Sequence, residues 1–139
     1  MTTTRPSLNF VLMDAPLESA RTTTAFRLLD IAARRGIPIK VFAYEGAVML
    51  PYARQQPHAN AVHGTSVEEE NHFLPRTAVA ALMETAQRQG GQLDWVNCGL
   101  CVDERGAGEP IAGVRRGSPV DFWQQATASL NTLVIATRD

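Results

Sequence analysis

The chain has 139 residues, a formal net charge of -1, 45% hydrophobic residues and 19% charged residues. This length predicts one domain, residues 1–139, and the composition is that of a soluble globular protein rather than a disordered one. The near-neutral charge favours neither nucleic acid nor an acidic membrane surface as a partner, and no apolar run approaches the roughly 20 residues of a membrane-spanning helix.

The N-terminal segment 1–7 contains one basic residue, Arg5, and the apolar run after it is too short for the core of a signal peptide. We therefore expect a cytoplasmic protein. In that reducing compartment the two cysteines, Cys98 and Cys101, are more often catalytic, redox-active or metal-binding than joined in a structural disulfide.

The first half of the chain predicts a strand, a helix and a second strand. Residues 8–13 form an apolar run typical of a buried strand, and residues 18–35 show helical spacing of apolar side chains. Gly36 is a natural end for that helix. Residues 37–44 then predict a strand, and the three elements make a parallel βαβ unit with a right-handed crossover.

The middle of the chain is less regular. Residues 45–56 begin with an apolar patch that Pro51 interrupts, which predicts a short or broken helix at the carboxyl edge of the sheet. Residues 55–70 are polar and predict a long loop. Helical spacing returns at residues 75–88, and Pro75 suits the first turn of that helix.

The last third predicts three strands and two helices. Residues 93–96 read as the third strand, 98–106 as a short helix, and 111–114 as a short fourth strand or an extended connection. Ser118 predicts the N-cap of a helix that runs to about Ser129, and residues 133–136 predict the last strand. The apolar set expected to face the core from the Ser118 helix is Val120, Phe122, Trp123, Ala126 and Leu130.

This alternation predicts an α/β fold, with an open, mostly parallel five-stranded sheet and helices on both faces, in flavodoxin-like layering. The turn after the first strand, residues 14–17, has no glycine-rich phosphate loop. We therefore expect no nucleotide cofactor, and no other cofactor is indicated.

Cys98 is the candidate nucleophile. It follows the third strand directly, and open α/β sheets form their sites at the carboxyl ends of the strands. A helix start after it offers free backbone N–H groups that favour thiolate, and Gly99 allows a reactant to approach. The candidates for a positive field that would hold an anionic sulfur are Arg105, Arg115 and Arg116.

Several readings of the cysteine pair stay open at this point. Cys98 could instead be a small buried apolar residue without a chemical role, and Cys101 could be either a resolving thiol or a packing residue. A thioredoxin-like dithiol is disfavoured because its motif follows the first strand of a βαβ unit. A zinc site with His58 and His63 matches no familiar spacing, so no metal is predicted. Either histidine is a candidate for proton transfer at the Cys98 site.

Taken together, the order of elements and the cysteine segment resemble the DsrE/TusD family of sulfur-relay proteins. The resemblance extends over nearly the whole chain. It includes segments 41–48, 98–106 and 113–118. The sulfur-carrying cysteine of the family stands eight residues before the glycine of an Arg-Gly pair, and Cys98 has this spacing to Gly106. Some members lack a cysteine at the position of Cys101.

The resemblance implies a DsrE-like fold and a sulfurtransferase-type function without a cofactor. Cys98 would accept sulfane sulfur as a persulfide from a donor protein and pass it to an acceptor protein. Relatives are usually homo- or hetero-oligomers, so a homo-oligomer, a trimer or a hexamer, is expected. A non-catalytic oligomeric subunit and a Cys98–Cys101 redox module are the alternatives.

Overall fold

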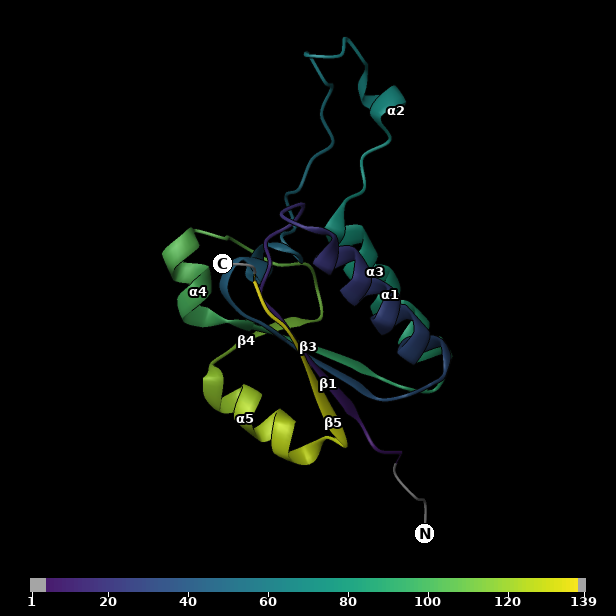
Figure 1. The fold of residues 1–139 in the computed structure, drawn as a ribbon, viewed down its shortest axis with the longest axis vertical. Coiled ribbons are helices and arrows are strands. Elements are labelled where there is room, and N and C mark those ends of the chain that lie inside the picture. Colours follow the sequence, from purple (N-terminus) through teal and green to yellow (C-terminus); the bar gives the residue numbers. More distant parts are fainter. Residues whose placement is uncertain (1–4, 138–139) are drawn as a thin grey trace.

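The sheet has five strands in the order β4-β3-β2-β1-β5, and all four neighbouring pairs are parallel (Figure 1). The computed structural model describes residues 5–137. Within that range no helix is both long and apolar enough to cross a membrane. The predicted α/β class is confirmed.

The elements, in chain order, are β1 (Leu8–Leu12), α1 (Ala20–Arg34), β2 (Ile39–Ala43), the 3-10 helix η1 (Glu45–Met49), α2 (Val67–Glu70), α3 (Pro75–Arg88), β3 (Leu93–Cys98), α4 (Gly99–Arg105), β4 (Val114–Gly117), α5 (Pro119–Ala128) and β5 (Asn131–Ile135).

Helices cover the sheet on both faces. Helices α1 and α3 pack side by side on one face, while α4 and α5 lie on the other (Figure 1). Because successive side chains of a strand point to opposite faces, β3 contributes to both layers. Trp95 lies in the core beneath α1 and α3, whereas Val96 and Cys98 lie in a smaller apolar cluster on the α4 side.

Local capping explains where the helices begin and end. The side chain of Ser19 accepts a hydrogen bond at the start of α1, and Gly36 follows the helix with φ +68°, which glycine adopts without strain. Ser118 and Asp121 form a reciprocal capping box at the start of α5. The predicted stop at Gly36 and the predicted N-cap at Ser118 are both confirmed.

Some predicted strand limits are wrong. The fourth strand is not at residues 111–114 but at Val114–Gly117, three residues later. Residues 107–113 instead form a connection in which Ile111 donates its N–H to the Pro51 carbonyl at 2.9 Å. The third strand continues to Cys98, and the last strand begins at Asn131 rather than at Leu133.

The expected core face of α5 is also wrong. Trp123 is 68% exposed, and Val120 and Leu130 are exposed as well. The residue of α5 that is buried is the polar Gln125, while Phe122 is half-buried against Phe42, with ring centroids 5.8 Å apart. The helix therefore turns much of its apolar surface outward.

The loop predicted for residues 55–70 forms a projecting arm. We define the arm as residues 56–72; it rises from the carboxyl edge of the sheet and carries α2 near its far end (Figure 1). No arm residue is buried. At its base, Gln55 is fixed to the body because its side chain donates to the carbonyls of Met49 and Leu50 and accepts from the N–H of Arg76.

Candidate functional site

Both cysteines lie at the carboxyl edge of the sheet. Cys98 is the last residue of β3 and the N-cap of α4, and Cys101 lies on the first turn of that helix. Neither forms a disulfide. Their exposed fractions are 1% and 4%, and both belong to the apolar cluster that includes Val11 and Phe42. The two thiols stand three residues apart at the start of α4 and share this cluster.

The two thiols have different surroundings. The pKa of Cys101 is raised to about 11, mainly by burial and to a lesser extent by Cys98 and the charge of Glu45, while a hydrogen bond from the backbone N–H of Glu45 opposes the shift. That N–H lies 3.2 Å from the Cys101 sulfur. A thiol with such a pKa is almost entirely protonated at neutral pH, so Cys101 offers little thiolate there.

The turn between β2 and η1 contributes residues that were not among the candidates. Besides its N–H, Glu45 offers its carboxylate, which binds Arg105 at 2.6 Å. Its backbone has φ +53°, a left-handed conformation that few non-glycine residues adopt. The pKa of Tyr44 is raised, first by Cys101 and then by Glu45. The available signal was their position directly after β2, at the same sheet edge as Cys98.

Among the three candidate arginines, Arg116 lies beside the start of α4. A Cβ atom at Gly99 would stand 2.5 Å from Arg116 Nε, so the guanidinium rests on the backbone of the residue after Cys98. Asp103 on α4 holds that guanidinium with contacts of 2.6 and 3.0 Å. This pairing raises the pKa of Arg116 and lowers that of Asp103, and Cys98 adds a smaller Coulombic contribution at Arg116.

Arg115 points elsewhere. Its guanidinium makes two contacts of 3.0 Å with Asp94 and one of 3.3 Å with Asp121. Asp94 stands four residues before Cys98 on β3, which corresponds to about 13 Å along the strand. These ion pairs raise the pKa of Arg115. The structure therefore brings Arg116 to the cysteine segment and directs Arg115 toward the other end of β3.

The histidines lie in the arm. The rings of His58 and His72 are 4.3 Å apart, and His72 Nε2 donates to the carbonyl of His58. His63 Nδ1 lies 3.5 Å from the Asn60 side chain. The arm projects away from α4 (Figure 1), and the cavity beside His58 is lined by no cysteine. His58 and His63 are thus not gathered around Cys98 in this conformation.

A cavity of about 550 Å³ lies between α4, the 106–110 turn and β4. Its charged lining residues are Asp103, Glu109, Arg115 and Arg116, and neither cysteine reaches it. Among residues 5–137, no group of three or more His, Cys, Asp or Glu side chains is arranged to bind a metal ion. The chemistry that this edge of the sheet offers is therefore that of two adjacent thiols next to an ion-paired arginine.

No protein-family model matches the chain, and no curated protein matches it by sequence. The crystal structure of the YchN protein from E. coli is similar, with a TM-score of 0.71 over 93% of this chain and 98% of that chain. The sequence identity is 17%, so the comparison shows the fold alone. YchN has a DsrE-like fold, and the predicted DsrE-like fold is confirmed.

Proposed function

We propose that the protein is a sulfur carrier that accepts sulfane sulfur as a persulfide on Cys98 and passes it to a partner protein. The observation that supports this most is the placement of Cys98 at the carboxyl end of β3, directly before a Gly99 backbone on which Arg116 rests. A cation at this point favours the anionic forms of sulfur that the reaction requires.

The transfer is a displacement at sulfur. The Cys98 thiolate attacks the outer sulfur of a donor persulfide, the donor S–S bond breaks, and the donor leaves as a thiolate. Cys98 then carries one additional sulfur atom, and no external oxidant or reductant is consumed. In the second transfer a cysteine of the acceptor attacks that outer sulfur, and Cys98 leaves as a thiolate.

The protonated state of Cys101 supports a carrier rather than a rapidly self-reducing dithiol. If the Cys101 thiolate attacked the inner sulfur of the persulfide, a Cys98–Cys101 disulfide would form and hydrosulfide would leave. With a pKa of about 11, Cys101 provides little thiolate at neutral pH, so this discharge is slow.

The burial of Cys98 implies that the donor reaches it only after a local displacement of α4. This helix has seven residues, and Leu100 on its outer side is 68% exposed next to the two thiols. We propose that donor and acceptor proteins dock on this end of α4. A homo-oligomer and a cytoplasmic location complete the proposal, since a reducing compartment keeps both thiols free.

Intact mass spectrometry after incubation with a small-molecule persulfide tests the proposal. Wild type and Cys101→Ser should gain the mass of one sulfur atom, and Cys98→Ser should gain none. A thiol reductant should remove the added sulfur. Uptake by Cys98→Ser equal to that of the wild type would show that Cys98 is not the carrier.

A dithiol redox module is the second candidate, because the two free thiols lie in one apolar cluster, three residues apart. In that case an equimolar oxidant converts the protein to a Cys98–Cys101 disulfide, and the persulfide form does not accumulate in the wild type. Titration against glutathione buffers measures the potential.

A third reading, a non-catalytic subunit, rests on the burial of both thiols. It predicts that neither cysteine reacts with a persulfide donor or an alkylating reagent until the protein unfolds.

A further inference from the structure

We propose that the arm of one copy of this chain docks into the groove between α1 and α3 of a second copy. This deepens the self-association included in the proposed function, because it names the two surfaces that meet. It does not depend on the chemistry at Cys98.

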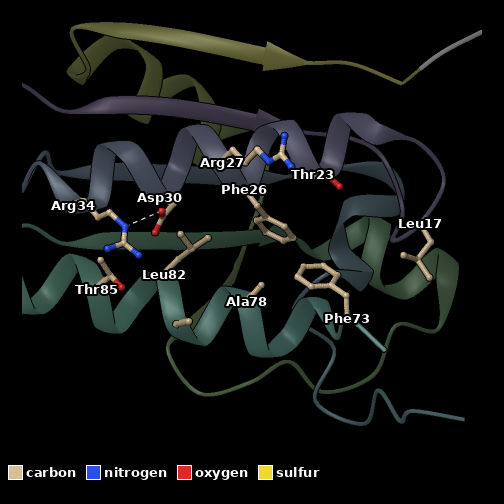
Figure 2. Close-up of a pocket in the computed structure, with 11 residues that line it drawn as sticks. Leu17, Thr23, Phe26, Arg27, Asp30, Arg34, Phe73, Ala78, Leu82 and Thr85 are labelled. Atoms are coloured by element: carbon tan, nitrogen blue, oxygen red, sulfur yellow. Dashed lines mark hydrogen bonds and ion pairs between the residues drawn. The ribbon is translucent and has the colours of Figure 1, made fainter. Parts of the chain in front are cut away.

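The groove is the first of the two surfaces. It has a volume of about 570 Å³ and runs between α1 and α3, with Phe26, Phe73 and Leu82 on its walls (Figure 2). Phe73 is 54% exposed, and Leu17 at the same end is 80% exposed. An apolar surface of this kind on an isolated chain is typical of an interaction site.

The rim of the groove is basic. Arg27 and Arg34 lie on its α1 side, and Arg34 binds Asp30 at 2.8 Å (Figure 2). Within residues 5–137, no carboxylate lies within ion-pair distance of Arg27. The charged residues that line the groove are Arg27, Asp30 and Arg34, which gives a formal charge of +1. The groove therefore suits an occupant that is apolar and acidic.

The arm has the complementary composition. Residues 56–72 contain Glu68, Glu69 and Glu70 and no Asp, Lys or Arg, so the arm has a formal charge of -3. Its apolar side chains have no packing of their own, since Val62 is 89% exposed and Val67 is 39% exposed. A segment that buries none of its residues in its own chain gains most of its stabilisation from a neighbour.

The geometry favours a second copy over the same chain. The arm points away from the body, and its base is held because Gln55 bonds to Met49, Leu50 and Arg76. For the arm to fold back onto its own groove, these hydrogen bonds would have to break. Because arm and groove are different surfaces, the contact closes as a reciprocal pair or as a ring.

Charge reversal on each surface tests the proposal. One variant carries Glu68→Lys, Glu69→Lys and Glu70→Lys, and the other carries Arg27→Glu and Arg34→Glu. Sedimentation of the full chain at low salt should show an oligomer for the wild type. Each variant alone should dissociate with a dissociation constant at least tenfold higher, because its arm and groove then have like charges.

The mixture of the two variants gives the sharpest readout. The lysine arm of the first variant faces the glutamate groove of the second, and the native arm of the second faces the native groove of the first. Equimolar mixing should therefore restore association with one copy of each variant per contact, as a reciprocal pair or as a ring with an even number of copies. A charge-matched control, Arg54→Glu with Arg88→Glu, changes two exposed arginines outside the groove and should leave assembly unchanged.

Three results would overturn the proposal. They are a wild type that stays monomeric at low salt, an oligomer that persists in both variants, and a mixture that associates no more than either variant alone. Circular dichroism confirms that each variant is folded. Persulfide uptake by the same proteins is measured in a separate experiment. Sedimentation then reports on assembly and the mass gain reports on the carrier function, so a failure of one is distinguished from a failure of the other.

Discussion

The protonated, buried thiol of Cys101 should make stability depend on pH in the alkaline range. Its folded pKa is raised from 9.0 to about 11, mainly by burial. Below pH 9 the thiol is protonated in both the folded and the unfolded chain. Between pH 9 and 11 the unfolded chain loses this proton and the folded chain keeps it, so rising pH favours unfolding.

The size of the effect follows from the shift. Two pKa units correspond to about 2.7 kcal/mol when the folded group is fully titrated, and to about 2 kcal/mol at pH 10.5. Other groups also titrate there, so the wild type must be compared with Cys101→Ala. That substitution leaves a cavity that costs roughly 1 to 2 kcal/mol at pH 8. The deficit should shrink with rising pH and disappear near pH 10.5.

Urea unfolding at half-unit steps from pH 8 to pH 10.5 measures this difference. Val11→Ala is the matched control, because Val11 lies in the same apolar cluster and carries no titratable group. Its destabilisation relative to the wild type should be the same at every pH. A Cys101→Ala deficit that is equally constant would refute the assignment of a protonated thiol to this position.

Two further substitutions test the local structure around β3 and α5. Asp121 accepts the N–H of Ser118 at 2.8 Å, which lowers its pKa, so Asp121→Asn should lose about 1 kcal/mol at neutral pH. Because the pKa of the folded carboxylate lies below its usual value, the deficit should shrink as pH falls from about 4 toward that lowered pKa; a deficit that stays constant from about pH 5 to about pH 2 in thermal melts would contradict this. Trp95 donates from Nε1 to the buried Asn97 side chain at 3.1 Å, so Trp95→Phe should lose about 1 to 3 kcal/mol in urea unfolding. A loss below about 0.5 kcal/mol would mean that Asn97 finds another donor.

The sequence predicted the frame of the site because that frame depends on local patterns. A short apolar run before Cys98 predicts a buried strand, and the βαβ order places the carboxyl ends of the strands at one edge. Capping residues such as Ser118 act on the backbone within one turn, so their effect is readable from spacing. These predictions needed no knowledge of which elements touch.

The choice between Arg115 and Arg116 could not be made from the sequence. In register Arg115 pairs with Val96 and Arg116 with Asn97, so alternation alone would select Arg115 for the sheet face of Cys98. The structure instead places Arg116 against Gly99. Strand β4 is short, and its two arginines are exposed. The pattern of this edge strand therefore lacks the apolar alternation that would have fixed its start at Val114.

The contact of Glu45 with Cys101 was not predicted from the sequence, for a different reason. The two residues are 56 positions apart, and no periodicity links them. Their meeting depends on the close approach of η1 to α4. On another side, η1 lies so close to the loop after β1 that a Cβ at Gly46 would stand 2.7 Å from Ala15. The close approach of two helices depends on tertiary packing, and the spacing of residues along the chain does not reveal it.

The outward apolar surface of α5 shows the limit of hydrophobic periodicity most clearly. Such a pattern says which side chains share a face of a helix, but not what lies beneath that face. The sheet below α5 is polar near its amino end, because Lys40, Asn9 and Thr132 are partners in register on β2, β1 and β5. Gln125 is the buried side chain of the helix above this part of the sheet.

The choice of buried residue on α5 therefore follows from the sheet and not from the helix. Only the carboxyl half of that sheet face is apolar, where Val11, Phe42 and Val96 gather around the two cysteines, and Phe122 is the α5 side chain that joins them. Trp123, the next residue along the helix, is not part of this cluster and is 68% exposed. The apolar residues of this sheet face therefore lie at the carboxyl edge, where the candidate site is, and they bury Cys101. That burial raises the pKa of Cys101 and keeps its thiol protonated.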